Sequence, residues 1–458
     1  MITQIEIDGF KTLQKVILPL RPFQVFAGPN NVGKSNLFDA LRLLSLLPDH
    51  DLPKILQSIR GEPYELFSQQ SNGTYAKRMR LAVELLLDNQ FQDEFEGEVK
   101  LKRNWLRYEV EIERDDGDNG ARLQIASEQL LLKLSDERLP WPVSRAFRET
   151  YLRFPRRNAP YISLNESGEM IVHQDGAERG RPRTMRRGTR QSILFVIRDA
   201  SEFPHICAVR NELQRWRFVH LEPEVMRGPN AVDGPDQLDS NGKYLAATLQ
   251  RIIKADPSMQ AEISAWVRQF ITGARELHVQ HLKELHQYLV ELQTQDGRRF
   301  SSRVLSDGTL RLLGLLALQY DPNQAGVICL EEPENGVHPR RLETVVSLLK
   351  GMATNPEATD FPLDDLQPLR QILMNTHSPH LVDQLQPEDL VLVEAVERFA
   401  QNGKAPERHT IYRPVVPPIW GPLLASPNHE ATKERLHRLL EEQELGALWT
   451  HGALGGIP

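Results

Sequence analysis

The feature that most constrains this chain is a glycine-rich segment near its start, Gly28-Pro-Asn-Asn-Val-Gly-Lys-Ser35, which fits the pattern GxxxxGK[ST]. An apolar run, Phe23–Ala27, precedes this segment, and apolar residues at helical spacing follow it over Lys34–Leu47. The pattern requires this order of strand, loop and helix, because the loop N–H groups and the helix N-terminus together bind an anion. The segment therefore predicts a loop that binds the phosphates of a nucleoside triphosphate.

Residues of this loop have distinct expected roles, with ATP and Mg²⁺ as the expected ligands. Lys34 is expected to reach the β- and γ-phosphates as a point charge, and the Ser35 hydroxyl to ligate Mg²⁺. The glycines let the backbone wrap around a phosphate. The residues that we expect to bind the nucleotide are Gly28, Asn30, Asn31, Val32, Gly33, Lys34, Ser35 and Asn36.

A second apolar strand, Gly326–Leu330, ends at two adjacent acids, Glu331 and Glu332. Burying unpaired charge is costly, so paired carboxylates at the end of a core strand favour a chemical role over packing. We expect Glu331 to hold Mg²⁺ through its water shell, and Glu332 to orient or deprotonate the attacking water. Considered without the phosphate loop, the pair also fits a solvated acidic turn.

Two further segments carry candidate residues. Ser306 or Asp307 is expected to cap an apolar helix over Leu310–Gln319, and such a helix start also presents a hydroxyl and N–H groups to an anion. Another apolar strand, which begins at Ile372, ends at His377. A single histidine is by itself more often structural than catalytic, and its position after the acidic pair is what makes it a candidate.

Composition and charge exclude several classes of protein. The sequence has no run of eighteen apolar residues, so it supports no membrane span, and the alternation over Met1–Phe10 favours a chain without a signal peptide. Cys207 and Cys329 lie too far apart in the sequence for a CxxC zinc site. We therefore expect a cytoplasmic protein. Its net charge of −7 argues against a surface coated with positive charge for nucleic acid.

Positive charge is nevertheless concentrated in one segment, Glu178–Gln191, where arginines alternate with Gly and Pro. Such a segment either neutralises the phosphates of DNA or forms a solvated loop, and the sequence leaves both interpretations open. The candidate nucleic-acid contacts are Arg179, Arg181, Arg183, Arg186, Arg187 and Arg190.

Taken in order, these segments resemble the ATP-binding-cassette (ABC) ATPases, specifically their soluble RecF/SMC/OLD-like branch. The run Glu332-Pro-Glu-Asn-Gly-Val-His-Pro339 is specific to this branch. The resemblance covers roughly residues 1–90 and 286–397. The segments that carry it are Gly9-Phe10-Lys11, Gly28–Asn36, Leu305–Arg311, Leu330–Pro339 and Thr376–Pro379.

The resemblance implies an α/β fold: a mixed sheet core with the phosphate loop, an antiparallel β subdomain and a helical lobe, without a long coiled coil. We expect an N-terminal ATPase lobe over residues 1–90 and an inserted mixed and helical region over 91–285. A C-terminal ATPase lobe would follow over 286–415. It would contain the signature, which is the segment Leu305–Arg311, together with the acidic pair and the histidine. A tail with a short helix would complete the chain over 416–458.

The resemblance also implies a homodimer or higher homo-oligomer in which ATP lies between two copies, head to tail. Ser306, Asp307 and Gly308 of one copy would contact the nucleotide that is held by the phosphate loop of the other. A single subunit should then bind ATP but hydrolyse it poorly until a second subunit completes the site.

By the same resemblance, Glu332 corresponds to the catalytic glutamate and His377 to the switch histidine that senses the γ-phosphate. Lys34 completes the expected catalytic set. A glutamine that contacts Mg²⁺ in relatives corresponds to Gln69 or Gln70, and the sequence does not choose between them. Glu331 stands where most relatives carry aspartate.

Two absences narrow the expected function. The sequence has neither a long coiled coil nor a hook cysteine pair, which argues against an SMC protein or a zinc-hook repair ATPase. Leu390–Glu394 resembles the first strand of a Toprim nuclease domain, but no DxD motif follows it. We therefore expect an ATPase without its own nuclease. A transporter cassette, with its membrane partner, is disfavoured.

The function that we infer from the sequence is an ATP-binding and ATP-hydrolysing switch subunit of a prokaryotic multi-protein system, in anti-phage defence. Through ATP-dependent dimerisation it would control a separate effector protein, a nuclease or a toxin. The alternative is a RecF-like DNA-binding ATPase in DNA repair. A third interpretation is a scaffold that holds nucleotide with little turnover.

Overall fold

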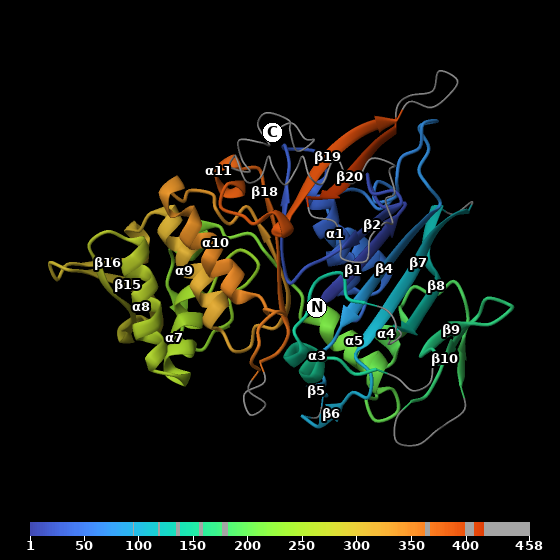
Figure 1. Ribbon diagram of the computed structural model, residues 1–458, viewed down its shortest axis with the longest axis horizontal. Helices are drawn as coiled ribbons and strands as arrows, with labels where there is room; N and C mark the ends of the chain where they lie inside the picture. Colours follow the sequence, from blue (N-terminus) through green and yellow to red (C-terminus); the bar gives the residue numbers. More distant parts are fainter. Residues whose placement is uncertain are drawn as a thin grey trace.

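The computed structural model describes residues 1–94, 96–117, 120–133, 138–154, 159–175, 182–361, 367–398 and 407–415. Figure 1 shows two lobes on either side of a central sheet: a helical lobe with α7 to α10, and a lobe built on a large antiparallel sheet. The expected tail over residues 416–458 lies outside the described residues. The α/β fold expected from the sequence is confirmed.

The central sheet has the strand order β12-β17-β18-β3-β19-β20. Its first five strands are parallel, and β20 pairs with β19 in the antiparallel sense. Parallel strands place their carboxyl ends at one edge of the sheet, which is where ligands bind in folds of this kind. The strands are β12 (Arg217–Val219), β17 (Gly326–Glu331), β18 (Arg370–Thr376), β3 (Phe23–Ala27), β19 (Leu390–Arg398) and β20 (Glu407–Pro414).

The antiparallel sheet has the order β11-β10-β9-β8-β7-β4-β1-β2. It joins strands from both sides of residue 90, so the boundary proposed there from the sequence lies between two parts of one sheet. A separate two-stranded ribbon joins β5 (Gln90–Gln92) and β6 (Glu98–Lys100). The strands of the larger sheet are β1 (Ile2–Asp8), β2 (Val16–Pro19), β4 (Arg78–Leu86), β7 (Trp105–Gly117), β8 (Gly120–Leu132), β9 (Ile162–Leu164), β10 (Met170–Val172) and β11 (Arg183–Met185).

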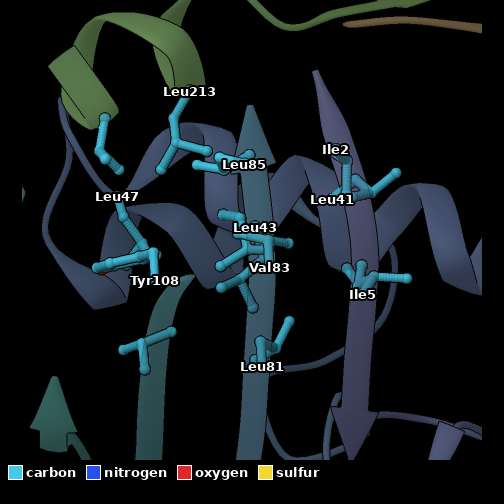
Figure 2. Close-up of a cluster of buried hydrophobic side chains, with 14 of the residues drawn as sticks. Ile2, Ile5, Leu41, Leu43, Leu47, Leu81, Val83, Leu85, Tyr108 and Leu213 are labelled. Carbon is cyan, nitrogen blue, oxygen red and sulfur yellow. The ribbon is translucent and has the colours of Figure 1, made fainter. Parts of the chain in front are cut away.

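Helix α1 (Lys34–Leu46), which follows the phosphate loop, packs on this antiparallel sheet. Its leucines recur at helical spacing, so that one face of the helix packs against β1, β4 and β7. Figure 2 shows Leu41 and Leu43 of α1 among side chains of these strands, with Leu213 of α5 (Pro204–Gln214) beside them. This buried contact fixes the helix, and with it the end of the phosphate loop, against a broad rigid surface.

The second lobe has four helices and a small sheet of β13 to β16, and its core is continuous with residues of the central strands β3, β17, β18 and β19. The turn Gln295–Arg298 joins two paired antiparallel strands, β15 and β16. The helices are α7 (Leu245–Ala255), α8 (Ser258–Phe270), α9 (Asp307–Tyr320) and α10 (Leu342–Met352), and the strands are β13 (Asn230–Ala231), β14 (Ala274–Leu282), β15 (Gln287–Thr294) and β16 (Arg299–Ser301).

Short helices complete the described part of the chain. Among these residues, no helix is long and apolar enough to span a bilayer, and Cys207 and Cys329 are both buried as free thiols. The remaining α-helices are α2 (Leu52–Ser58), α3 (Arg145–Tyr151), α4 (Ile193–Val196), α6 (Pro223–Met226) and α11 (Pro379–Val382), and the 3-10 turns are Lys283–Leu285, Ser302–Val304, Pro339–Arg341 and Pro387–Asp389.

Candidate functional site

The phosphate loop, the acidic pair and the histidine meet at the carboxyl edge of the central sheet. The loop follows β3, the acidic pair straddles the end of β17, and His377 follows β18, which lies between the other two strands. In register, Thr376 lies opposite Ala27 on one side, and Asn375 lies opposite Glu331 on the other. The sheet therefore brings together segments that are separated by some 300 residues of sequence.

The backbone of the loop explains its two glycines. Gly33 has a φ of 101°, a left-handed conformation that L side chains rarely adopt, and a Cβ atom there would overlap the hydroxyl of Thr410. Gly28 lies against the carbonyl oxygen of Val393 in β19, with no room for a Cβ atom. Asn31 is also left-handed, with a φ of 63°. The loop is therefore a tight turn enclosed by the β19–β20 pair.

Lys34 lies inside this turn and is only 7% exposed. Its ammonium group donates to the carbonyl oxygens of Gly28 at 2.6 Å and Pro29 at 2.7 Å. Burial lowers the pKa of Lys34, and the charges of Glu332 and Glu334 oppose that effect. The lysine thus places a cation between the loop and the carboxylates of the neighbouring strand end.

Glu332 is the most constrained acid of the site. Its φ of 46° is left-handed, and its N–H donates to the backbone oxygen of Asn375 at 3.2 Å and to the side-chain oxygen of the same residue at 3.1 Å. Its carboxylate accepts from Asn335 Nδ2 at 2.8 Å and lies 2.8 Å from His377 Nδ1. An uncommon backbone conformation held by specific bonds is typical of functional sites.

These partners set the ionisation of Glu332. Burial raises the pKa of this carboxyl, but the hydrogen bonds from Asn335 and His377, together with the charges of His377 and Lys34, outweigh it. The net result is a pKa below the usual value of 4.5. Glu332 is therefore a carboxylate at neutral pH and can accept a proton.

A third acid, Glu334, was missed by the sequence reasoning. It is 5% exposed and accepts a hydrogen bond from the hydroxyl of Thr376, while its Oε2 atom is buried without a hydrogen-bond partner among the described residues. Burial raises the pKa of Glu334. The run Glu-Pro-Glu was the available signal, because it repeats an acid two residues after Glu332.

Glu331 differs from Glu332 in its bonds rather than in its exposure, because Glu332 is held by short bonds to Asn335 and His377. The Glu331 side chain is 32% exposed, and its carboxylate lies 3.9 Å from the guanidinium of Arg60, which also pairs with Asp39 at 3.2 Å. A hydroxyl at Ser35 and a carboxylate at Glu331 are the oxygen donors that Mg²⁺ prefers. The long ion pair leaves the Glu331 oxygens available, so the donor set fits this metal.

Neither candidate glutamine is shown beside these donors. Gln69 and Gln70 are both exposed, and Gln70 accepts from the Thr74 hydroxyl at 3.3 Å. Gln70 lines a surface cavity of about 500 Å³ together with Asp8, Arg78 and other residues, and neither Glu331 nor Glu332 lines that cavity. A different cavity, of about 330 Å³, lies beside His377 and Glu334.

The signature residues lie in the other lobe. Ser306 caps α9 as expected, accepting from Thr309 N at 3.3 Å, and both Ser306 and Asp307 are exposed. Figure 1 shows α9 and α1 in different lobes. The chain therefore does not bring Ser306 to its own phosphate loop. Asp307 instead receives a hydrogen bond of 2.5 Å from Arg227.

The start of α9 does contact the turn that holds Glu332. Gly308 lies against the carbonyl oxygen of Gly336, where a Cβ atom would overlap it. Arg311, one turn further along α9, donates to the carbonyl oxygen of Asn335 at 2.7 Å. Since the Asn335 amide binds Glu332, the signature helix and the acid are joined through one residue.

The arginine-rich segment is remote from these groups. Its described part belongs to β11, the edge strand of the antiparallel sheet, and to the residues that follow. Arg183 pairs with Glu202 at 2.6 Å, and Arg187 donates to the carbonyl oxygen of Gly168. Arg186 and Arg190 are exposed, whereas Arg179 and Arg181 lie outside the described residues.

The comparisons with known proteins agree with these motifs. Residues 23–383 match a family model described as "AAA domain, putative AbiEii toxin, Type IV TA system". The matched span begins at β3 and includes the phosphate loop, the signature residues, the acidic pair and His377. No curated protein matches the sequence.

Solved structures with low sequence identity also match most of the chain. An Smc head bound to the C-terminal winged-helix domain of ScpA is 13% identical, covers 90% of this chain and 97% of its own, and has a TM-score of 0.47. A Pyrococcus furiosus complex of the Smc head with an extended coiled coil and the C-terminal domain of ScpA is 12% identical, with coverages of 96% and 98% and a TM-score of 0.46. The Thermotoga maritima SMC head is 13% identical, with coverages of 90% and 98% and a TM-score of 0.37.

Proposed function

The chain belongs to the AAA-domain family whose model it matches over residues 23–383, and on that premise we propose that it binds ATP with Mg²⁺ and hydrolyses the nucleotide. Membership supports the ABC-type ATPase that the sequence motifs predict. The observation that carries the proposal of hydrolysis is the Glu332 carboxylate, held 2.8 Å from His377 Nδ1 and 2.8 Å from Asn335 Nδ2.

Hydrolysis joins a water oxygen to the γ-phosphorus and breaks the bond from that phosphorus to the oxygen shared with the β-phosphate. Glu332 accepts the proton of the attacking water, because the hydrogen bonds and positive charges around it keep its pKa low and the group ionised. Lys34 supplies positive charge from within the loop, and His377 orients the Glu332 carboxylate.

Mg²⁺ would be held by Ser35 and Glu331. The metal would neutralise charge on the phosphate oxygens when bound. Arg60 and Asp39 contribute on the protein side: Asp39 holds the guanidinium of Arg60 at 3.2 Å, so that Arg60 stays near Glu331 without a short bond to it. Glu331 can then turn towards a metal at little cost.

The site is proposed to be complete only between two copies. Ser306 and Asp307 are exposed at the N-terminus of the 14-residue helix α9, and Gly308 is half-buried beside them. In a head-to-tail dimer, this helix start would approach the nucleotide in the phosphate loop of the other copy. Arg311 connects α9 to Asn335, which binds Glu332. Binding of the second copy at the start of α9 would therefore also affect the position of Glu332 in the same chain.

For the biological role, we propose an ATP-dependent switch in a prokaryotic defence or toxin–antitoxin system, acting on a separate effector that is a nuclease or a toxin. The family description, which refers to a toxin of a type IV toxin–antitoxin system, supports this role. A RecF-like DNA-binding ATPase is the alternative, supported by the exposed Arg186 and Arg190. Replacing both with alanine should lower DNA affinity and its salt dependence if that alternative holds.

ATP turnover by the full chain with Mg²⁺ tests the hydrolytic function. Glu332→Gln should retain ATP binding and lose about 100-fold or more of its turnover, because it keeps the shape but cannot accept a proton. Glu343→Gln, at an exposed acid at the start of α10, is the matched control and should behave as the wild type. Equal turnover of the wild type and Glu332→Gln, or no turnover by either, would reject the proposal.

A further inference from the structure

The last described strand, β20, lies directly against the phosphate loop. Three of its residues, Arg408, Thr410 and Tyr412, occupy alternate positions and therefore face the same side of the strand. Each donates a side-chain hydrogen bond to the loop backbone. Thr410 Oγ1 donates to the carbonyl oxygen of Val32 at 2.8 Å, and the Tyr412 hydroxyl donates to that of Gly33 at 3.1 Å.

The third donor is the guanidinium of Arg408, which bonds to the carbonyl oxygen of Asn31. The strand thus binds three consecutive carbonyls of the loop, those of Asn31, Val32 and Gly33. In a trans peptide unit the C=O and N–H bonds point in opposite directions. With these carbonyls held towards β20, the N–H groups of the next residues, from Val32 to Lys34, point away from it.

We propose that β20 orients the phosphate loop for its anion, with Arg408, Thr410 and Tyr412 as positioning residues. N–H groups that point together into one concavity bind an anion through their partial positive charges. Without an external constraint, the carbonyls of Asn31 and Val32 could rotate towards a phosphate, whereas the carbonyl of Gly33 also accepts from Asn36 N at 3.0 Å. The donors of β20 remove this freedom before the nucleotide arrives, which lowers the entropic cost of binding.

The geometry behind two of the donors, Thr410 and Tyr412, supports a fixed scaffold. Thr410 is 3% exposed, and its hydroxyl lies 2.5 Å from that of Thr12, which accepts from Asn36 Nδ2 of α1 at 2.8 Å. Thr410 also fills the space beside the Cα of Gly33. The ring of Tyr412 packs edge-on against Phe26 of β3, with ring centroids 6.0 Å apart. Thr410 and Tyr412 are therefore held by neighbouring elements and do not depend on the loop for their position, whereas Arg408 is exposed.

This inference rests on the proposed function, because it assigns the anion to the phosphates of the nucleotide. It predicts an effect on nucleotide binding that is separate from the chemical step. The groups around Glu332 bond to His377, Asn335 and Asn375, and the bonds described here do not include those residues. Loss of the β20 donors should therefore raise KM for ATP and leave kcat nearly unchanged.

The experiment compares variants of the full chain by calorimetric titration with Mg²⁺-ADP and by steady-state ATP turnover. Thr410→Val removes one hydroxyl at constant shape, and Tyr412→Phe removes another; each should weaken ADP binding about fivefold, since one hydrogen bond contributes about 1 kcal/mol. The triple variant Arg408→Met, Thr410→Val, Tyr412→Phe should weaken it by about 100-fold.

Two controls separate positioning from general damage. Thr410→Ser keeps the hydroxyl and should bind ADP within about twofold of the wild type. Arg413→Met removes an arginine from the other side of β20, where it pairs with Glu394 at 2.7 Å, and should have no effect on ADP affinity. If the triple variant does not fold, the pair Thr410→Val and Thr410→Ser decides the question.

Hydrogen exchange provides a second readout. If the loop and β20 bind each other, ADP should slow amide exchange in β20 of the wild type, and this protection should be lost in Thr410→Val. Wild-type affinity and protection in Thr410→Val would overturn the inference while leaving the proposed function intact. A wild type that binds neither ADP nor ATP would instead overturn the proposed function.

Discussion

The phosphate loop and the start of α9 are both helix N-termini that are expected to meet the same nucleotide, yet the chain supports them differently. Around the loop, Thr410 and Tyr412 hold the carbonyls, and Lys34 is 7% exposed. At the start of α9, Ser306 and Asp307 are exposed. The loop is complete within one chain, whereas the signature presents its groups to whatever docks there.

The two regions also carry charge in different ways. Near the loop, Lys34 lies among the acids Glu332 and Glu334. At the start of α9, the acid Asp307 would repel a phosphate, but Arg227 donates to it at 2.5 Å and to the carbonyl oxygen of Leu305, also at 2.5 Å. The difference indicates that the phosphate loop provides the positive charge that binds the nucleotide. At the start of α9, Arg227 offsets the negative charge of Asp307, so that an anion can approach.

The largest predicted effect tests whether the two regions form one site between copies. Lys34→Ala should abolish ATP turnover by removing the loop cation, and Ser306→Arg should abolish it by blocking the signature, each by about 1,000-fold or more. Mixing the two inactive variants should restore part of the turnover, because one of the two sites in a mixed dimer then has an intact loop and an intact signature.

The measurement is ATP turnover against mixing ratio, with each variant at the same total concentration as in the mixture. A maximum at equal amounts supports the composite site. Mixtures that stay as inactive as the separate variants would contradict it, and the start of α9 would then be a helix cap with no part in the reaction.

The sequence predicted the elements of this comparison that depend on local spacing. The phosphate loop lies between a strand and a helix as expected, the acidic pair Glu331 and Glu332 lies at the end of a buried strand, and Ser306 caps α9. Each of these features is determined within about ten residues of sequence, a range over which hydrophobic periodicity and capping residues predict local structure.

The supports of the loop could not be predicted in this way. Thr410 and Tyr412 bond to residues 378 and 379 positions away in the sequence, and no local pattern marks them. The same applies to Glu334, because its hydrogen-bond partner Thr376 lies in another strand, β18, that is distant in the sequence. The antiparallel sheet, too, joins strands on both sides of residue 90 through pairings between distant segments.

The next effect is a pH dependence of stability that arises from Glu128, a buried acid in the lobe that carries the phosphate loop. Glu128 is 1% exposed and accepts from the Tyr108 hydroxyl at 2.9 Å and from Ile193 N at 2.7 Å. Burial raises its pKa from 4.5 to about 7, so the folded state binds this proton more tightly than the unfolded state does. Its contribution to stability is therefore complete below pH 4.5 and is lost as pH rises to about 7.

This loss corresponds to about 3 kcal/mol in the free energy of unfolding, and it should be absent in Glu128→Gln. Urea unfolding of both proteins between pH 4.5 and 8 measures the difference between their profiles. Parallel profiles would mean that Glu128 is ionised in the folded protein and that its charge is balanced inside this lobe.

A smaller effect tests whether Arg227 neutralises the charge of Asp307 at the start of α9. Arg227→Met removes the partner of Asp307, so the acid faces the nucleotide uncompensated, and ATP turnover should fall about tenfold. ATP binding to a single subunit should not change, because the phosphate loop lies in the other lobe. Arg275→Met, at an exposed arginine of β14, is the matched control. A loss of binding in Arg227→Met equal to the loss of turnover would contradict this assignment.

The smallest effect concerns Asn335, which joins the two regions by bonding to Glu332 while its carbonyl accepts from Arg311 of α9. Asn335→Ala removes a hydrogen bond that lowers the pKa of Glu332, so that pKa rises and the acid limb of the kcat profile moves towards neutral pH. At pH 7.5 Glu332 is ionised either way, and kcat should stay within about threefold of the wild type. Asn323→Ala, at an exposed site, should leave the profile unchanged. An acid limb that Asn335→Ala does not move would show that His377 and Lys34 suffice to ionise the acid, and that α9 does not act on it through Asn335.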